Sequence, residues 1–331
     1  MKLNKCTIIA EAGVNHNGDF DMAVEMIESA AAAGADVIKF QTISKETGFN
    51  FAIQDEDILQ FIENSSFNFG QYKKLKNICN ENNINFMSSA ADLPAVKLLS
   101  SLGVNVFKVS SGNFTNYQLL NSLVKHDKPM ILSTGMSTSD EIEETYRFIT
   151  SLGFPEEKLS FLYCVSEYPA NYTNINLSKM TDMILRYPRV KIGFSDHSEG
   201  IVSSILARSL GAKIIEKHFT LDKSLEGPDQ LFSLNPSELK SLVEGVKHTD
   251  QILFDEKKLN SGESISKKKI RRTLYFNKNL LSGHVVSELD FAAKRPFNAQ
   301  GISPKKFLSV IGKKIVKDVQ VNEVVTIDKL C

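Results

Sequence analysis

Eight short apolar segments alternate along most of the chain with longer stretches in which apolar residues recur at helical spacing. Each segment is short enough for a buried strand, and a glycine usually closes the helical stretch before the next one. This repetition predicts an α/β protein built on a (β/α)8 TIM barrel. The segments are Thr7–Ala10, Val37–Phe40, Ile84–Met87, Val104–Val109, Pro129–Leu132, Leu159–Val165, Val190–Phe194 and Lys213–Ile215.

Polar side chains stand where these segments end. In barrels of this kind the carboxyl ends of the strands and the loops after them form one open face, which carries the catalytic groups. We therefore expect the strand ends to mark the rim of an active site. The polar residues are Glu11, Gln41, Ser88, Ser111, Ser133, Ser166, His197 and His218.

The chain is longer than a barrel requires, since its 331 residues exceed the roughly 250 of a typical one. A polar, glycine-containing stretch without periodicity predicts a linker at 256–270. Beyond it lie short strand-like segments separated by glycine and proline, at Thr273–Phe276, Val285–Val286 and Val324–Ile327. We expect a barrel domain at 1–255 and a small compact domain at 271–331.

Composition narrows the range of functions. The formal net charge is zero, and the basic run at 267–272 lacks interleaved aromatic residues, so we expect no nucleic-acid partner. The first apolar segment is interrupted early by Glu11, which predicts no signal peptide, no membrane span and a cytoplasmic enzyme. The four cysteines form no C-x-x-C pair, which favours reduced thiols over a zinc site or disulfides.

Two histidines, His197 and His218, follow the last two predicted strands and should lie close together. Neutral imidazole is a common ligand of zinc, manganese and iron, and two protein nitrogens leave coordination positions open for substrate. We therefore predict a metal site. For either histidine alone, a local hydrogen-bonding role would be the simpler interpretation.

Lys39 and Lys108 also lie late in their strands, among several serines. Two ammonium groups with hydroxyls and backbone amides make a cradle for phosphate or carboxylate. A Schiff-base aldolase using one of these lysines is the alternative, although it requires a desolvated, unpaired amine. The remaining polar residues suit a polyhydroxylated ligand, without selecting a sugar over another polar metabolite: Glu11, Asn15, His16, Gln41, Tyr168 and Asp229.

Seven motifs along nearly the whole chain, in order, resemble those of the sialic acid synthases. They are Glu11–Gly18, Lys39–Thr42, Leu132–Met136, Cys164–Pro169, Gly193–His197, Glu216–Thr220 and Gly227–Asp229. Lys294–Pro296 and Gly301–Pro304 look like the C-terminal antifreeze-like (SAF, β-clip type) domain of that family. The resemblance implies condensation of phosphoenolpyruvate with N-acetylmannosamine or a related amino sugar, giving a nine-carbon 2-keto acid and phosphate.

The resemblance also implies roles for individual residues. His197 and His218 would hold manganese or magnesium, and Glu11 would orient or deprotonate the attacking water. Arg295 would reach the sugar from the partner subunit of a domain-swapped homodimer, beside the sugar contacts Gln41, Tyr168 and Asp229. The phosphoenolpyruvate-binding residues would be Lys39, Ser88, Lys108, Ser111, Ser133, Ser166 and Ser195.

Departures from the family pattern bear on the acceptor sugar. Asn113 stands where relatives commonly carry an acidic residue, Tyr163 replaces a frequent histidine, and 89–91 and 297–300 also differ. N-acetylmannosamine, giving N-acetylneuraminate, and deoxy diacetamido sugars, giving legionaminate or pseudaminate, stay open as acceptors. A non-catalytic sugar-binding or ice-binding protein is the alternative from another class, which the complete rim of polar residues disfavours.

Overall fold

The computed structural model describes residues 5–42, 64–254 and 260–331. Contacts divide the chain into two compact units, Met1–Asp255 and Glu256–Cys331. The division falls at the end of the eighth β/α repeat, where the sequence pattern also changes.

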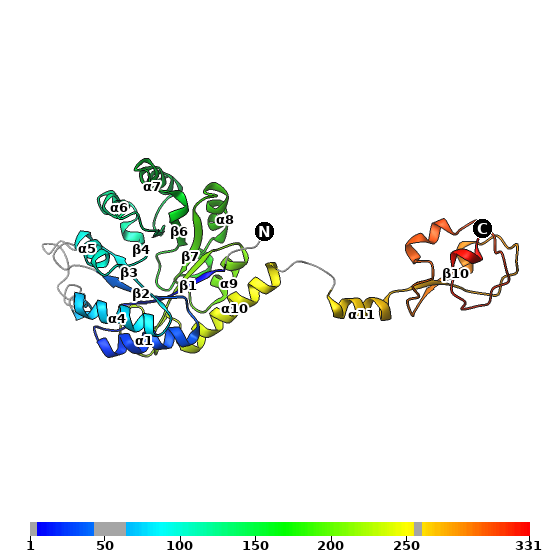
Figure 1. Cartoon of the computed structure of the whole chain (residues 1–331), viewed down its shortest axis with the longest axis horizontal. Helices are drawn as coiled ribbons and strands as arrows, with labels where there is room; N and C mark the ends of the chain where they lie inside the picture. Colours follow the sequence, from blue (N-terminus) through cyan, green and yellow to red (C-terminus); the bar gives the residue numbers. More distant parts are fainter. Residues whose placement is uncertain (1–4, 43–63, 255–259) are drawn as a thin grey trace. The chain divides into compact units, whose positions relative to one another are not determined.

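The first unit is a closed barrel of eight parallel strands in sequential order, in which β1 pairs with both β2 and β8 (Figure 1). The predicted (β/α)8 fold is confirmed. The fourth strand is shorter than expected, because only the last three residues of the apolar segment 104–109 enter the ladder. The strands are β1 (Thr7–Gly13), β2 (Val37–Thr42), β3 (Asn85–Ala90), β4 (Phe107–Val109), β5 (Met130–Ser133), β6 (Leu159–Cys164), β7 (Lys191–Asp196) and β8 (Ile214–His218).

Helices surround the strands and cover their outer side (Figure 1). Several begin at side-chain caps; in α7, Thr138 and Glu141 form a capping box that satisfies backbone amides of the first turn. No helix in the described ranges is long and apolar enough to span a membrane. The helices are α1 (Phe20–Ala33), α4 (Phe69–Glu81), α5 (Leu93–Ser101), α6 (Tyr117–Val124), α7 (Ser139–Ser151), α8 (Leu177–Arg186), α9 (Val202–Ser209) and α10 (Pro236–Phe254).

The interior of the barrel has an apolar layer directly below its polar mouth. Successive side chains of a strand point to opposite faces, so residues two apart share the interior. Ile9 therefore precedes Glu11 on the inner face of β1, and Val37 precedes Lys39 on that of β2. The apolar layer consists of Ile9, Val37, Met87, Ile131, Leu162 and Ile214, with Val106 packed against it.

The second unit contains α11 (Ser261–Ile270) and the antiparallel pair β9 (Thr273–Phe276) and β10 (Phe291–Lys294). The described part of the predicted linker, 260–270, is therefore largely helical, and an Asn260–Glu263 capping box begins the helix. Of the three predicted strand segments, only 273–276 is a strand; Val285 and Val324 form isolated bridges. The unit has its own core of buried residues, Leu274, Phe276, Leu280, Val286, Phe291, Ile302, Val310, Ile315, Val319, Val325 and Leu330.

We predict that Gly193→Ala destabilises the barrel. A Cβ at this position on β7 would lie 2.4 Å from the Ile214 carbonyl oxygen and 2.7 Å from a Leu162 methyl carbon. Forcing a methyl group into such a site costs about 1–3 kcal/mol. Gly112→Ala is the matched control, because its Cβ would meet nothing within 4 Å. Chemical denaturation measures both, and equal stability of the two variants would contradict the prediction.

Candidate active site

A cavity of about 190 Å³ opens at the carboxyl ends of the barrel strands. Every strand contributes to its wall, directly or through the loop that follows, as the strand-end pattern predicted. The lining residues are Glu11, Lys39, Gln41, Ser89, Ala91, Lys108, Ser110, Ser111, Ser133, Cys164, Tyr168, Ser195, His197, Glu216, His218 and Asp229.

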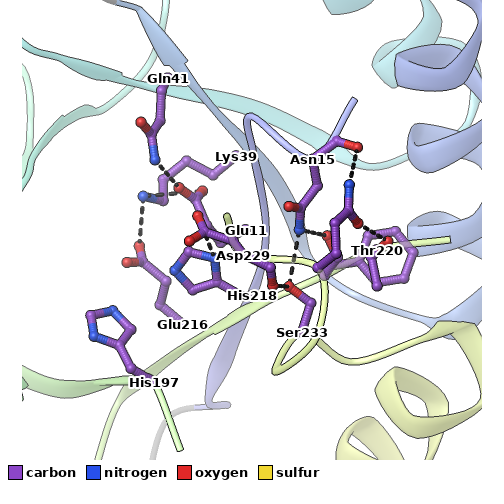
Figure 2. A network of polar contacts seen from close by, with 12 residues as sticks. Glu11, Asn15, Lys39, Gln41, His197, Glu216, His218, Thr220, Asp229 and Ser233 are labelled. Carbon is purple, nitrogen blue, oxygen red and sulfur yellow. Dashed lines mark hydrogen bonds and ion pairs between the residues drawn. The ribbon is translucent and has the colours of Figure 1, made fainter. Parts of the chain in front are cut away.

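Two buried ammonium groups and two buried carboxylates form the floor of this cavity. Figure 2 shows Lys39 between Glu11 and Glu216, with Nζ to carboxylate distances of 3.1 and 3.4 Å. Lys108 Nζ lies 3.6 Å from the other oxygen of Glu216 and donates to Ser133 Oγ at 2.7 Å. Ser195 Oγ donates to Glu216 at 2.9 Å. The two lysines are thus bridged by a single carboxylate.

Burial and mutual charge shift the pKa values of these groups in different directions. Burial raises the pKa of Glu11 to about 7, outweighing the opposing effect of Lys39. Burial also lowers the pKa of Lys108 to about 8, although Glu216 opposes it. For Glu216 burial acts upward, but the two lysines outweigh it and hold its pKa below the usual range. Of these two carboxylates, Glu11 is therefore the one able to exchange a proton near neutral pH.

The two predicted imidazoles lie together at the edge of the cavity, with ring centroids 5.3 Å apart. Burial lowers the pKa of His197 to about 4 and, with His197 nearby, lowers the pKa of His218 well below its usual value. Both rings are therefore neutral near pH 7. Tyr168 stacks on His197 at 4.2 Å between centroids, and Asp229 Oδ2 lies 3.4 Å from His218 Nδ1.

The two rings carry nitrogens that could serve as ligands of a divalent metal ion. His197 Nδ1 lies 2.8 Å from the Val165 carbonyl oxygen, which assigns the proton to Nδ1 and leaves the Nε2 lone pair for a ligand. His218 Nδ1 is buried and makes no hydrogen bond, although the Asp229 carboxylate lies 3.4 Å away. Among the described residues, no group of three or more His, Cys, Asp or Glu side chains is arranged to hold a metal ion.

The loop that carries Asp229 is held by a buried amide network on the other side of β1 (Figure 2). Asn15 Nδ2 donates to the Phe219 carbonyl and to Ser233 Oγ, each at 2.9 Å. Gln230 Nε2 donates to the Asn15 carbonyl at 2.9 Å, and Ser233 Oγ donates to the Asp229 carbonyl at 2.6 Å. The network ties both ends of the Asp229 segment to the β1 loop and thereby places its carboxylate beside His218.

Most of the predicted site residues are brought together, but five are not in the cavity: Asn15 belongs to the amide network and His16 stacks on Phe67, and the other three are Ser88, Ser166 and Arg295. Ser88 faces the helix layer, where its hydroxyl pairs with Thr42 Oγ1 at 2.7 Å, and its neighbour Ser89 lines the cavity instead. Ser166 lies beside the cavity, with its buried hydroxyl unpaired. Arg295 belongs to the second unit and donates to the Ile270 carbonyl. Those that line the cavity are Glu11, Lys39, Gln41, Lys108, Ser111, Ser133, Tyr168, Ser195, His197, His218 and Asp229.

Sequence reasoning missed Glu216 as a functional residue. It lies on β8 two residues before His218, and therefore on the same inner face. That spacing was the available signal. Two of the noted departures do not line the cavity: the Tyr163 hydroxyl accepts from the Asn176 amide, and Asn113 accepts from Asn116.

Buried lysines, carboxylates and paired imidazoles lie together at the carboxyl face of the parallel barrel. This arrangement is typical of a barrel enzyme that binds anionic substrates. The chain matches the model of the NeuB family over residues 26–258. It is 37% identical to the N,N'-diacetyllegionaminic acid synthase of Campylobacter jejuni, over 98% of this chain and 99% of that protein. It is 31% identical to the human N-acetylneuraminate-9-phosphate synthase, over 97% and 91% of the two chains.

Among solved structures, the N-acetylneuraminic acid synthetase of Leptospira borgpetersenii in complex with citrate superimposes with a TM-score of 0.73 and 34% identity. The match covers 80% of this chain and 90% of that one. The chain therefore belongs to the NeuB family, and the resemblance to sialic acid synthases inferred from the motifs is confirmed at the level of the family.

We predict that Gly135→Ala weakens phosphate binding. A Cβ here would lie 2.2 Å from Ser166 Oγ and 2.6 Å from Ser111 Oγ, so it would displace two hydroxyls expected to bind the anion. Displacement of this kind should raise the dissociation constant of phosphoenolpyruvate by about tenfold. Titration calorimetry measures it, with Gly112→Ala as the control one residue beyond Ser111. Unchanged affinity in Gly135→Ala would refute these serines as anion ligands.

Proposed function

We propose that this protein is a nonulosonate synthase that joins phosphoenolpyruvate to the aldehyde of an open-chain amino sugar. The products are a nine-carbon 2-keto sugar acid and inorganic phosphate. The observation that carries the proposal is the pair of buried ammonium groups, Lys39 and Lys108, within one cavity that also holds two neutral imidazoles. Family membership agrees with this reaction, because the relatives are named as synthases of such acids.

The lysines and serines provide the binding site for the trianionic substrate. Lys39 and Lys108 would bind its phosphate and carboxylate with Ser111, Ser133 and Ser195, whose hydroxyls are at the same cavity wall. Glu216 keeps both ammonium groups charged and in place before the substrate arrives. With Glu11 protonated, the cluster carries net positive charge, which favours an anion.

In the reaction the methylene carbon of phosphoenolpyruvate bonds to the aldehyde carbon, whose oxygen becomes a hydroxyl. Water then adds to the former enol carbon, and the bond from that carbon to the phosphate oxygen breaks. The two protons of the water end on the new hydroxyl and on the departing phosphate. Glu11, with its pKa raised to about 7, is suited to orient this water and carry its proton.

His197 and His218 would hold manganese or magnesium through their unprotonated nitrogens. The ion, when bound, supplies Lewis-acid polarisation of the aldehyde oxygen. Gln41, Tyr168 and Asp229 line the outer part of the cavity and would contact the sugar hydroxyls. Tyr168 is half-exposed, so its ring is free to cover a bound ligand while it stacks on His197.

The second unit would act as an antifreeze-like domain that completes the site of a partner subunit through Arg295. Charge supports this arrangement. Residues 1–255 carry 23 Lys and Arg against 32 Asp and Glu, whereas 256–331 carry 16 against 7. The chain with zero net charge therefore consists of an acidic barrel and a basic tail, whose opposite charges would favour the proposed swapped homodimer.

N-acetylmannosamine and deoxy diacetamido sugars are both acceptors within this proposal. The relatives include synthases named for legionaminic acid and for N-acetylneuraminate 9-phosphate, with similar identities to this chain. Ser89 and Ala91, two of the residues that depart from the family pattern, line the cavity. Their small side chains leave more space in the cavity beside Gln41, which favours an acceptor bulkier than N-acetylmannosamine.

A Schiff-base aldolase is the second candidate, because burial lowers the pKa of Lys108 to about 8. The contacts of Lys108 disfavour it. Its Nζ donates to Ser133 and to the Val109 carbonyl and lies beside Glu216, so the amine is fully engaged. Borohydride reduction in the presence of substrate separates the two mechanisms, since only an aldolase would be trapped as a covalent adduct.

We predict that phosphate release requires phosphoenolpyruvate, amino sugar and divalent metal together. A panel of mannosamine and diacetamido sugars, with mass analysis of the keto acid, identifies reaction and acceptor in one assay. His197→Gln and His218→Gln should each lower kcat by at least about a hundredfold, because each removes a metal ligand. Phosphate release without sugar, or full activity after dialysis against EDTA, would overturn the proposal.

We also predict that Arg295→Ala is rescued by a second inactive variant. Arg295→Ala and His218→Gln should each be inactive alone, but co-expression should give hybrid dimers with one intact site. Random pairing restores about a quarter of the wild-type activity if Arg295 acts in the partner's site. Should the arginine act in its own chain, or not at all, the mixture would stay inactive or Arg295→Ala would be active by itself.

A further inference from the structure

In the two strands that lead to the histidines, side chains point alternately into the barrel and outward, and the pattern is the same in both. On β7, Ser195 lines the cavity and His197 follows at its edge; on β8, Glu216 and His218 line it. The residues between them, Asp196 and Lys217, therefore point outward, toward the helix layer. Neither of these two charged side chains has any solvent exposure.

Asp196 and Lys217 form an ion pair, with Nζ 3.2 Å from Oδ2. The other contacts of Asp196 are all donated by serines. The Ser198 amide and hydroxyl donate at 2.9 and 2.7 Å, and the hydroxyls of Ser203 and Ser204, in the first turn of α9, donate at 2.5 and 2.6 Å. Lys217 also donates to the Ser198 carbonyl. The pair thus joins both strand ends, the loop after His197 and α9.

The pair also lies at a fixed register. Asp196 is the direct partner of Lys217 in the parallel ladder, and Ser195 is that of Glu216. Sliding one strand by a single residue would turn its inward side chains to the outer face. Such a slip would separate Asp196 from Lys217 and bury an uncompensated charge, so the pair opposes any displacement of one histidine relative to the other.

We propose that Asp196 and Lys217 are a positioning pair that sets the separation of His197 and His218 for metal binding. This inference rests on the proposed metal-dependent function. The pair touches neither substrate nor metal; it acts through the adjoining imidazoles.

A second ion pair, buried at its arginine and partly exposed at its aspartate, supplies a control. Arg208 Nε lies 2.6 Å from Asp250 Oδ1 and connects α9 to α10. Its arginine side chain is also fully buried and belongs to the same helix, α9, but it adjoins neither histidine. A purely structural role for Asp196 and Lys217 would make the two pairs equivalent.

The test compares Lys217→Met with Asp250→Asn in the full-length protein. Manganese affinity is measured on metal-free protein by electron paramagnetic resonance, and thermal stability is measured in EDTA. We expect Lys217→Met to weaken manganese binding by at least about tenfold, as changes behind metal-bound histidines do, while Asp250→Asn lowers the melting temperature without changing affinity. Affinity within twofold of wild type in Lys217→Met, or an equal loss in both variants, would overturn the inference.

Ser204→Ala provides a milder variant should Lys217→Met not fold. It removes one of the hydroxyls that hold Asp196 and should weaken manganese binding in the same direction; unchanged affinity there counts against the positioning role. The wild-type measurement separates the two proposals. If wild-type protein binds no manganese, or His197→Gln and His218→Gln bind it equally well, the metal-dependent function fails; normal wild-type binding with normal Lys217→Met binding removes only the positioning pair.

Discussion

The alternation of side-chain direction along eight parallel strands is the constraint on which the site depends. Residues two apart share the barrel interior, so one apolar layer lies directly below one polar layer. The apolar layer excludes water from beneath Lys39 and Lys108. It thereby creates the low-dielectric surroundings in which their interactions with carboxylates and with an incoming anion are strong.

The same burial gives chemically similar groups different roles. Glu216 contacts both lysines and stays ionised, whereas Glu11 contacts only one of the two, Lys39, and has its pKa raised to about 7. One carboxylate thus acts as a fixed counter-charge, and the other is able to move a proton. Two carboxyl groups whose pKa values differ in this way are expected where a reaction needs both charge stabilisation and a base.

The fold and most of the cavity could be predicted from the sequence because both follow from local periodicity. The sequence-based predictions were wrong where the periodicity is ambiguous. Ser88 and Ser89 are adjacent serines on β3, and only the pairing of Ser89 with inward-facing residues decides which one enters the cavity. Glu216 was overlooked because its role depends on Lys39 and Lys108, which lie on distant strands. The helix at 261–270 has no buried face, so its cap was its strongest signal.

The acceptor sugar is the property that both the sequence and the structure define least, and the reason is physical. The reacting groups lie on strands or, like His197, one residue beyond a strand, whose register fixes them. Apart from Gln41 on β2, the groups that would recognise the sugar lie on loops or, like Arg295, in another unit. Loop residues are held by particular contacts rather than by a repeat, as the amide network around Asp229 illustrates. Chemistry common to a family can thus be conserved in the barrel while specificity varies at its mouth, because substitution there leaves the strand register and the buried charges unchanged.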